Sequence, residues 1–346
     1  MRFMEIDPQP ARGKLDESMW DSPDWLAEEK YDGERRIAQF CGSVVRFTGR
    51  RSRTTNKVVE KTAQLPHLSG DSAVPLDGDH RIISPPRTLD GTVLDGELIL
   101  PAGYVSFCDG GKSKAVTSIA NSLPAEAIRK QIQRGWLRYV VFDCLFWEGS
   151  DVRDRPLEER KRYAACAVNT WANPFVPLAP VLCSTLKRTT YEQIIERGGE
   201  GVILKRLDHR YGDEKGWVKV KKISTADVVI IGFKAAKETS KKVDGTISKT
   251  KYAGKVGSVE IGQYRPYRGL KEKDPVIPVG FARGFSDRLM DEFTRHPKKY
   301  LGKVITIEAN DREPTGKFRH PRVIHPDDPF RADKDPKSCV FDLNER

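Results

Sequence analysis

A lysine stands at the centre of the segment Glu28-Glu29-Lys30-Tyr31-Asp32-Gly33-Glu34-Arg35. Apolar residues precede the segment and a strand-like run follows it, so the sequence predicts two strands joined as a hairpin by a tight turn at Asp32-Gly33. Lys30 would then lie at a strand end, where its amine could act as a nucleophile. Lowering a lysine pKa from about 10.4 to near neutrality corresponds to roughly 4 kcal/mol. Desolvation and a neighbouring cation such as Arg35 act in this direction.

Four further segments combine charged residues with strand-like runs or stand near the C-terminus. They are Leu94-Asp95-Gly96-Glu97-Leu98, Glu200-Gly201-Val202-Ile203-Leu204-Lys205, Trp217-Val218-Lys219-Val220-Lys221 and Arg331-Ala332-Asp333-Lys334. Because side chains alternate along a strand, Asp95 and Glu97 should share one face, as should Lys219 and Lys221. Ammonium groups suit a phosphoryl group, because negative charge accumulates on it when it is attacked. Carboxylates suit a metal ion.

In this order and at these separations, the five segments closely resemble the motifs of the covalent nucleotidyltransferases, and among them those of ATP-dependent DNA ligases. The resemblance spans roughly residues 25 to 340. It implies an α+β nucleotidyltransferase (adenylation) domain followed by a C-terminal OB-fold domain. The size of the chain implies the minimal two-domain type, similar to phage or accessory bacterial ligases, acting as a monomer on nicked double-stranded DNA.

The resemblance also implies three chemical steps. Lys30 Nζ would attack the α-phosphate of ATP, giving a lysyl-AMP phosphoramidate and pyrophosphate. AMP would then move to the 5′-phosphate at a nick, and the 3′-hydroxyl would attack that phosphate and release AMP. Glu97 and Glu200 would hold Mg²⁺, for which Mn²⁺ could substitute, because Mg²⁺ uses few carboxylates and several waters.

Further residues are assigned to the nucleotide by the same resemblance. Glu28 matches the residue that reads the adenine amino group, and Phe142 matches a phenylalanine that packs against the adenine. Arg35 and Arg50 match residues that contact ribose or phosphate, and Glu97 would also reach the ribose. The family usually has a Ser-Arg pair where this chain has Gly49-Arg50, so Arg51 is the alternative to Arg50.

Cations are also expected beside the phosphates. Lys219 and Lys221 would flank the α-phosphate, with Lys205 as a weaker candidate for the same site. Arg331, Asp333 and Lys334 resemble the family's last motif, which swings over the ATP and orients the pyrophosphate leaving group. This role requires a mobile second domain and should matter mainly for the first step.

Composition is compatible with these expectations. The chain has 346 residues, a length typical of about two domains. Of its formal net charge of +11, the segment 205–255 carries +8, with 14 Lys and Arg against 6 Asp and Glu, which favours a nucleic-acid partner. The six cysteines include no CxxC pair, so neither a zinc site nor a disulfide framework is indicated. No apolar run approaches the roughly 20 residues of a membrane span. A cytoplasmic enzyme is therefore expected, and the resemblance to phage or accessory bacterial ligases implies a bacterial or phage-infected cell.

The pattern of elements predicts where the two domains lie. Residues 1–223, with an irregular lead-in over 1–24, would form the adenylation domain from mixed strands and helices. Residues 224–346 would form the OB-fold domain, in which a basic loop over 234–255 either stays solvated or orders on DNA phosphates. The strands expected there are 228–233, 257–262 and 304–309. One amphipathic helix is also expected, which Ser286 could cap and whose apolar side Leu289, Met290 and Phe293 would form.

Three other functions share part of this pattern. An mRNA-capping guanylyltransferase shares the lysine motif, the OB-fold and a similar last motif, although Glu28 and Tyr31 favour the ligase. An RNA ligase fits less well, because many lack an OB domain that carries the last motif. A non-enzymatic, basic OB-fold protein that binds nucleic acid would not need the complete set of lysine, carboxylate and Arg-Asp-Lys motifs.

Overall fold

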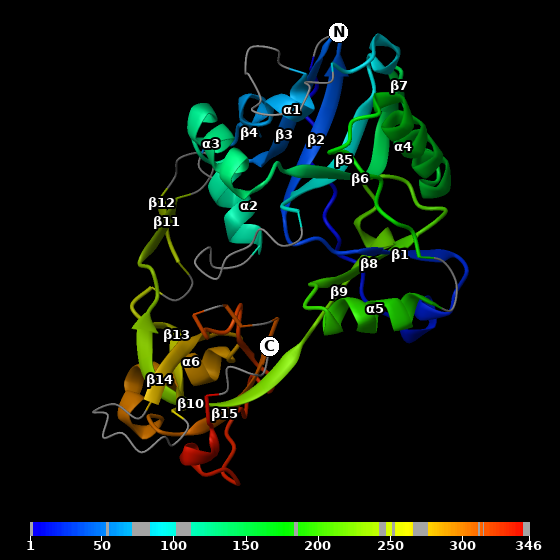
Figure 1. Cartoon of the computed structure of the whole chain (residues 1–346). Helices are drawn as coiled ribbons and strands as arrows, with labels where there is room; N and C mark the ends of the chain where they lie inside the picture. Colours follow the sequence, from blue (N-terminus) through cyan, green and yellow to red (C-terminus); the bar gives the residue numbers. More distant parts are fainter. Residues whose placement is uncertain are drawn as a thin grey trace. The chain divides into compact units, whose positions relative to one another are not determined.

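The computed structural model consists of two compact units, residues 1–221 and 222–346 (Figure 1). The first unit mixes strands and helices, whereas the second is built mainly from one antiparallel sheet, as the sequence predicted for an α+β domain followed by an OB-type domain. The structure describes residues 3–52, 55–70, 84–101, 112–182, 186–241, 247–250, 253–265, 276–310, 312–313 and 315–341. Within these ranges, none of the helices has the length and apolar character needed to span a bilayer.

Two antiparallel sheets form the first unit. The six-stranded sheet has the order β4-β3-β2-β5-β6-β7, and the three-stranded sheet has the order β1-β8-β9. The strands are β1 (Trp25–Glu29), β2 (Glu34–Cys41), β3 (Val44–Arg51), β4 (Val58–Glu60), β5 (Val93–Ile99), β6 (Arg138–Trp147), β7 (Ser150–Asp151), β8 (Gly201–Arg206) and β9 (Trp217–Lys221). In the smaller sheet β1 pairs with β8, although 170 residues separate Lys30 from Glu200. Long-range pairing therefore builds the sheet that carries the lysine segment.

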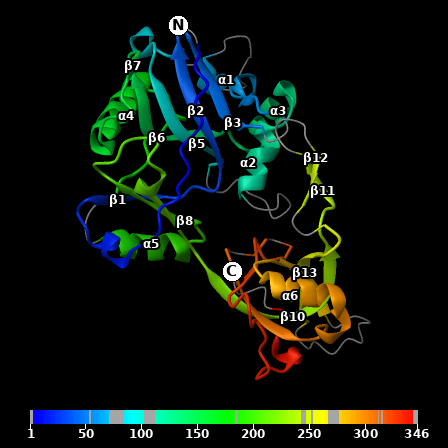
Figure 2. The ribbon, with the colours of Figure 1, turned by 180° about the vertical axis from the view of Figure 1, so that it is seen from behind.

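Helices cover both sheets of this unit, as the two views show (Figures 1 and 2). They are α1 (Pro66–Ser69), α2 (Lys112–Ala120), α3 (Pro124–Arg134), α4 (Leu157–Trp171) and α5 (Leu186–Glu196). The largest core joins α2, α3 and α4 to one face of the six-stranded sheet, where Trp171 of α4 packs edge-on against Phe40 at 4.8 Å between ring centroids. Ile194 of α5 packs against the apolar face of the three-stranded sheet. Burial of these apolar faces holds the two sheets in place.

The turn at Asp32-Gly33 joins the two sheets and does not close a hairpin. β1 pairs with β8, while β2 pairs with β3 and β5. The predicted hairpin around Lys30 is therefore wrong. The physical reason is that Ala27 is buried beside Val202 and Leu204, so β1 gains an apolar core contact from a distant strand that no local turn signal reveals.

Five strands form the sheet of the second unit in the order β14-β13-β10-β15-β16. They are β10 (Ser224–Ala235), β13 (Val256–Tyr264), β14 (Val276–Ala282), β15 (Val304–Ala309) and β16 (Arg322–Val323). Arg283, just after β14, pairs in parallel with Arg322 of β16, and the Val323 amide donates a hydrogen bond to the Arg283 carbonyl at 2.9 Å. This pairing joins the two ends of the sheet, so the topology is consistent with a small OB-fold barrel.

One helix interrupts this sheet. α6 (Asp287–Arg295) lies between β14 and β15 in the chain and buries Leu289, Met290 and Phe293 against the barrel core. These are the residues predicted for its apolar side. Ser286 occupies the N-cap position as predicted, but its side chain makes no capping hydrogen bond.

The basic segment 234–255 is not one continuous loop. β10 extends to Ala235, and β11 (Thr239–Lys241) pairs with β12 (Ile247–Lys249) as an antiparallel ribbon. Residues 242–246 and 251–252 of this segment lie outside the described residues. The prediction of a loop is thus corrected, because β-branched residues such as Thr239 and Ile247 favour extended backbone that can pair.

Candidate active site

A cavity of about 640 Å³ in the first unit is lined by residues from both sheets. Its described lining contains eight basic and four acidic side chains. The basic ones are Arg12, Lys30, Arg35, Arg36, Arg50, Lys205, Lys219 and Lys221, and the acidic ones are Glu28, Glu29, Glu34 and Glu97. A concave site with excess positive charge suits a polyanionic ligand such as a nucleoside triphosphate.

Strand register brings the predicted residues of the three-stranded sheet onto one face. Glu28 lies opposite Ile203, which lies opposite Lys219, and all three line the cavity. The alternate positions, such as Val202 and Val218, are buried in the core on the other face. Two of the predicted placements are confirmed by this register, since Lys219 and Lys221 share a face and both line the cavity.

Lys30 follows the last residue of β1 and is held by a carboxylate. Its backbone amide donates a hydrogen bond to the Gly201 carbonyl at 2.9 Å, and its Nζ donates to Glu200 Oε2 at 2.5 Å. Lys221 Nζ contacts the other oxygen of Glu200. Burial alone would raise the pKa of Glu200, but the two lysines outweigh burial and hold this pKa below its ordinary value. Glu200 thus stays ionised beside the predicted nucleophile.

Gly33 allows the turn to pass close to β5. A Cβ at this position would overlap the Leu98 carbonyl oxygen and approach Cγ of Glu97 at 2.9 Å, so glycine is required here by space. Burial raises the pKa of Glu97 to about 8, while the charges of Lys30 and Arg35 oppose the change. A metal ion bound at Glu97 would have to displace this proton.

Arg35 reaches the cavity but is anchored from behind. Its Nε and Nη2 donate to the two carboxylate oxygens of Asp95 at 2.9 Å and 2.5 Å, and Asp95 is fully buried. Tyr211 also donates its hydroxyl to Asp95 at 2.6 Å. The guanidinium lies 5.3 Å from the ring centroid of Phe142. Much of the hydrogen-bonding capacity of Arg35 is therefore used to fix its position in the cavity wall.

At the aromatic end of the cavity, one carboxylate meets two ammonium groups. Lys205 Nζ donates to Glu28 Oε2 at 2.6 Å, and Lys161 Nζ from α4 contacts Glu28 Oε1. Lys205 Nζ also lies 4.3 Å from the Phe142 ring centroid and 4.1 Å from that of Trp217. Burial lowers the pKa of Lys205 to about 7 and lowers that of Lys161 well below its ordinary value. The cluster presents donors and an acceptor beside an aromatic wall, as recognition of a purine base requires.

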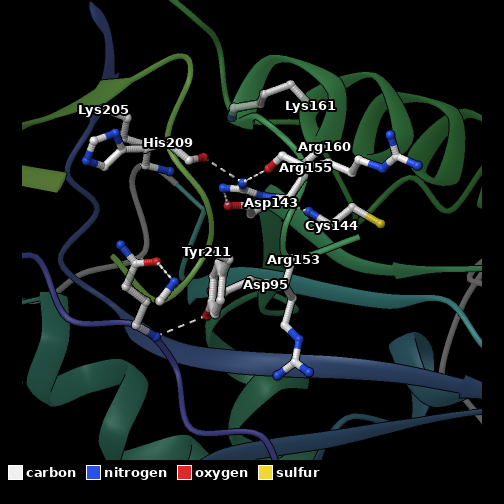
Figure 3. Close-up of polar contacts among 12 residues, drawn as sticks. Asp95, Asp143, Cys144, Arg153, Arg155, Arg160, Lys161, Lys205, His209 and Tyr211 are labelled. Carbon is white, nitrogen blue, oxygen red and sulfur yellow. Dashed lines mark hydrogen bonds and ion pairs between the residues drawn. The ribbon is translucent and has the colours of Figure 1, made fainter. Parts of the chain in front are cut away.

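A second buried ion pair joins α4 to β6 (Figure 3). Arg160 of α4 donates from Nε and Nη2 to the two oxygens of Asp143 at 2.8 Å and 3.0 Å. Its Nη1 donates to the carbonyl oxygens of Arg155 and His209 at 2.6 Å and 2.8 Å. Both side chains of the pair are completely buried. This network ties α4 to β6, and hence positions Lys161 and Phe142.

The two neighbouring arginines of β3 have different surroundings. Arg50 lines the cavity, whereas Arg51 donates to Glu5 Oε2 at 2.6 Å and to Asp7 Oδ2 at 3.1 Å. Neither acidic residue is among the described lining residues. Arg50 is thus the arginine at the cavity, while Arg51 is held by acidic residues of the N-terminal segment.

The Arg331 motif lies in the second unit and forms a charged cluster there. Arg331 donates to both oxygens of Asp333 at 2.9 Å and 2.7 Å, which lowers the pKa of Asp333 to about 2. Lys334 Nζ lies 3.2 Å from Asp227 Oδ2 on β10, and Thr306 of β15 donates to the other Asp227 oxygen at 2.6 Å. The three predicted residues are thus together, while the described lining of the cavity comes wholly from the first unit.

Sequence reasoning assigned no role to several residues of this site. Asp95 was placed beside Glu97, and its strand position could have identified it as a partner for a cation. Lys161, Tyr211 and Asp227 carried no signal, because only the tertiary fold brings them to Glu28, Asp95 and the Arg331 motif.

Glu97 and Glu200 are the two carboxylates predicted to hold a metal ion. Among the described residues, no group of three or more His, Cys, Asp or Glu side chains is arranged to hold a metal ion. Glu97 and Glu200 nevertheless flank the Lys30 amine closely enough for their charges to interact. Two carboxylates suit Mg²⁺, which keeps several waters and is completed by substrate phosphates.

The chain is similar to known DNA ligases. The family model for the ATP dependent DNA ligase domain matches residues 14–221. A DNA ligase of Methanoculleus marisnigri is 25% identical over 305 residues, which cover 86% of this chain and 47% of the relative. A DNA ligase of Thermococcus fumicolans is 29% identical over 228 residues, which cover 62% of this chain and 36% of the relative. The chain thus spans about half, or less, of the length of these curated relatives.

Solved structures include one that matches along its whole length. A structure from a study of Lig E DNA ligases aligns with a TM-score of 0.58 at 17% identity, covering 94% of this chain and 100% of that one. At this identity the likeness concerns the fold, and it extends over both units.

Proposed function

We propose that this chain, which belongs to the ATP-dependent DNA ligase domain family, is a DNA ligase that seals nicks between a 5′-phosphate and a 3′-hydroxyl in duplex DNA. The observation that carries the proposal is the position of Lys30. Its amine lies just after the end of a strand, in a cation-rich cavity. The amine donates a hydrogen bond to Glu200, and its charge interacts with Glu97. This is the arrangement that covalent transfer of a nucleotide to a lysine requires.

In the first step, Lys30 Nζ attacks the α-phosphate of ATP. The N–P bond forms as the bond to pyrophosphate breaks, and the amine loses its proton. Lys219 and Lys221 supply positive charge on the strand face beside Lys30, where the equatorial oxygens gain negative charge. Glu28, Lys205 and Phe142 would hold the adenine at the aromatic end of the cavity.

Mg²⁺ would be held by Glu97 and Glu200, and when bound it would neutralise charge on the α-phosphate. A cation held by Glu200 would compete with Lys30 for Oε2 of this carboxylate, while Lys221 contacts the other oxygen. Glu200 therefore positions the Lys30 amine in the protein without ATP.

The DNA partner is supported by charge. The segment 205–255 carries +8 of the net charge, and part of it forms the β11–β12 ribbon. Basic side chains on an extended ribbon can follow DNA phosphates without reading the base sequence. We propose that the substrate is a nicked duplex and that the protein is a cytoplasmic monomer that uses ATP and Mg²⁺.

Covalent transfer of AMP tests the proposal. Purified protein is incubated with Mg²⁺ and α-labelled ATP, with Lys30→Ala and Lys30→Arg in parallel, and then chased with nicked duplex. Wild-type protein should take the label and release it as DNA is sealed, and both variants should stay unlabelled. Labelling by GTP alone would contradict the ligase assignment, and label that survives the chase would contradict nicked DNA as the acceptor.

A further inference from the structure

The cavity continues past the N-terminal end of β2 to a second arginine. Arg35 and Arg36 are neighbours on β2 and point to opposite faces of the sheet, yet both line the cavity. Glu34, which contacts Arg36, also lines the cavity, as do Val59 and Asn121. The cavity thus reaches side chains from both faces of β2 near the start of this strand.

Arg36 is buried with incomplete pairing. Its side chain is 3% exposed, and its Nη2 donates to Glu34 Oε1 at 2.5 Å. Within the part of the chain that the structure describes, Arg36 Nε and Glu34 Oε2 are buried without a hydrogen-bond partner. Burial lowers the pKa of Arg36 from its ordinary value, more than Glu34 and Glu97 raise it. A buried donor without a partner is uncommon in native proteins and is a reason to look for a ligand.

Gly49 of β3 makes the room for this side chain. A Cβ at position 49 would overlap Arg36 Nη1, while the backbone of Gly49 is not in the left-handed region. Glycine is therefore needed here for space and not for its backbone freedom.

We propose that Arg36 is a phosphate-binding residue of this cavity, whose guanidinium exchanges Glu34 for a phosphate oxygen of the substrate. The inference rests on the proposed function and extends it by one residue. The planar guanidinium fork matches two oxygens of a phosphate, and Nε is the donor that the contact with Glu34 leaves unused. Glu34, whose side chain is 22% exposed, can turn towards solvent when a phosphate replaces it.

Two variants test the residue in different ways. Arg36→Met removes the guanidinium but keeps an unbranched side chain of similar reach. Gly49→Ala keeps Arg36 but places a Cβ where its Nη1 now lies, and because the clash is with the end of a flexible side chain, the guanidinium and not the backbone should move. Each single variant should weaken phosphate binding about tenfold, and the double variant should be no worse than Arg36→Met alone.

Two measurements distinguish the sources of the phosphate. The KM for ATP in self-adenylylation reports on the triphosphate, and the Kd of the pre-adenylylated protein for nicked duplex at fixed salt reports on the DNA backbone. If Arg36→Met raises only the KM for ATP, Arg36 binds the triphosphate. If it raises only the Kd for nicked duplex, Arg36 binds the DNA backbone. A rise in both values assigns Arg36 to both ligands. Glu34→Gln is the matched control, because it frees Arg36 and should leave affinity equal or higher.

Wild-type KM and Kd values in Arg36→Met would overturn the inference, provided the thermal midpoint shows a folded protein. Additive losses in the double variant would also overturn it, because Gly49→Ala would then act by another route. A wild-type protein that neither takes the label nor seals DNA would instead contradict the proposed function, so the two failures are distinguishable.

Discussion

Two ion pairs in the first unit differ in how completely they are buried. Asp143 and Arg160 are both 0% exposed, whereas Lys30 and Glu200 are 22% and 14% exposed. Arg160 also donates to two carbonyl oxygens, so its guanidinium is well satisfied within the protein. Glu200 is shared between Lys30 and Lys221 at the cavity wall. The first pair is enclosed in the fold, whereas the second lies at the cavity wall, where solvent and a ligand can reach it.

The largest effect is expected on stability when the buried pair is broken. Asp143→Ala leaves the Arg160 guanidinium buried without its carboxylate, which should lower the free energy of unfolding by about 3–5 kcal/mol. Urea unfolding of the whole chain, followed by a probe in the first unit, measures this change. Asp151→Ala is the control, because its partner Arg153 is half exposed and the change should stay below about 1 kcal/mol. Equal effects of the two variants would contradict the contrast in burial.

The pair at the cavity wall should matter for chemistry more than for stability. Glu200→Ala removes the group that positions Lys30 and one of the two predicted metal ligands, so the single-turnover rate of AMP transfer should fall about 10²–10³-fold. Glu126→Ala is the matched control, because Glu126 pairs with the exposed Arg129 and is not among the described residues that line the cavity. Its rate should stay within about threefold of wild type. A Glu200→Ala protein with normal AMP transfer would remove Glu200 from the site.

The raised pKa of Glu97 predicts a pH dependence of stability. Its pKa is about 8 in the folded protein, against 4.5 for the ordinary value. The folded state therefore keeps a proton that the unfolded chain loses, and stability should fall as pH rises from about 4.5 to about 8, by at most about 1.4 kcal/mol per pH unit. In Glu97→Gln this contribution disappears, so the difference between the two proteins, measured by urea unfolding in EDTA, isolates it.

Mg²⁺ provides the check on this assignment. Binding to ionised Glu97 should lower its pKa and flatten the difference between wild type and Glu97→Gln across the same pH range. Parallel pH curves of the two proteins in EDTA would show that Glu97 titrates normally.

The smallest effect separates two neighbouring arginines. Arg50→Ala removes a cation from the cavity and should slow AMP transfer about tenfold, whereas Arg51→Ala breaks contacts with Glu5 and Asp7 and should slow it less than threefold. Pre-steady-state labelling with ATP measures both. The reverse order would place Arg51, and not Arg50, on the nucleotide.

Local patterns explain why much of the site could be predicted. Alternation along β-strands is a property of a few consecutive residues, so Lys219 and Lys221 could be placed on one face from the sequence alone. The prediction of a hairpin at Asp32-Gly33 failed because turn residues do not say which strand becomes the partner. The prediction for the basic segment 234–255 was wrong for a different reason. Its composition indicated a loop, whereas part of its backbone pairs as β11 and β12.

The sequence by itself determined the family and the types of residue that line the cavity, because motif order and strand alternation can be recognised without knowledge of the fold. Only the tertiary structure decided which charges meet. In the tertiary structure Lys161 contacts Glu28, Arg160 pairs with Asp143, and Arg36 packs against Gly49. The physical reason is that ion pairing and burial depend on long-range strand register and helix packing, which local residue types do not encode.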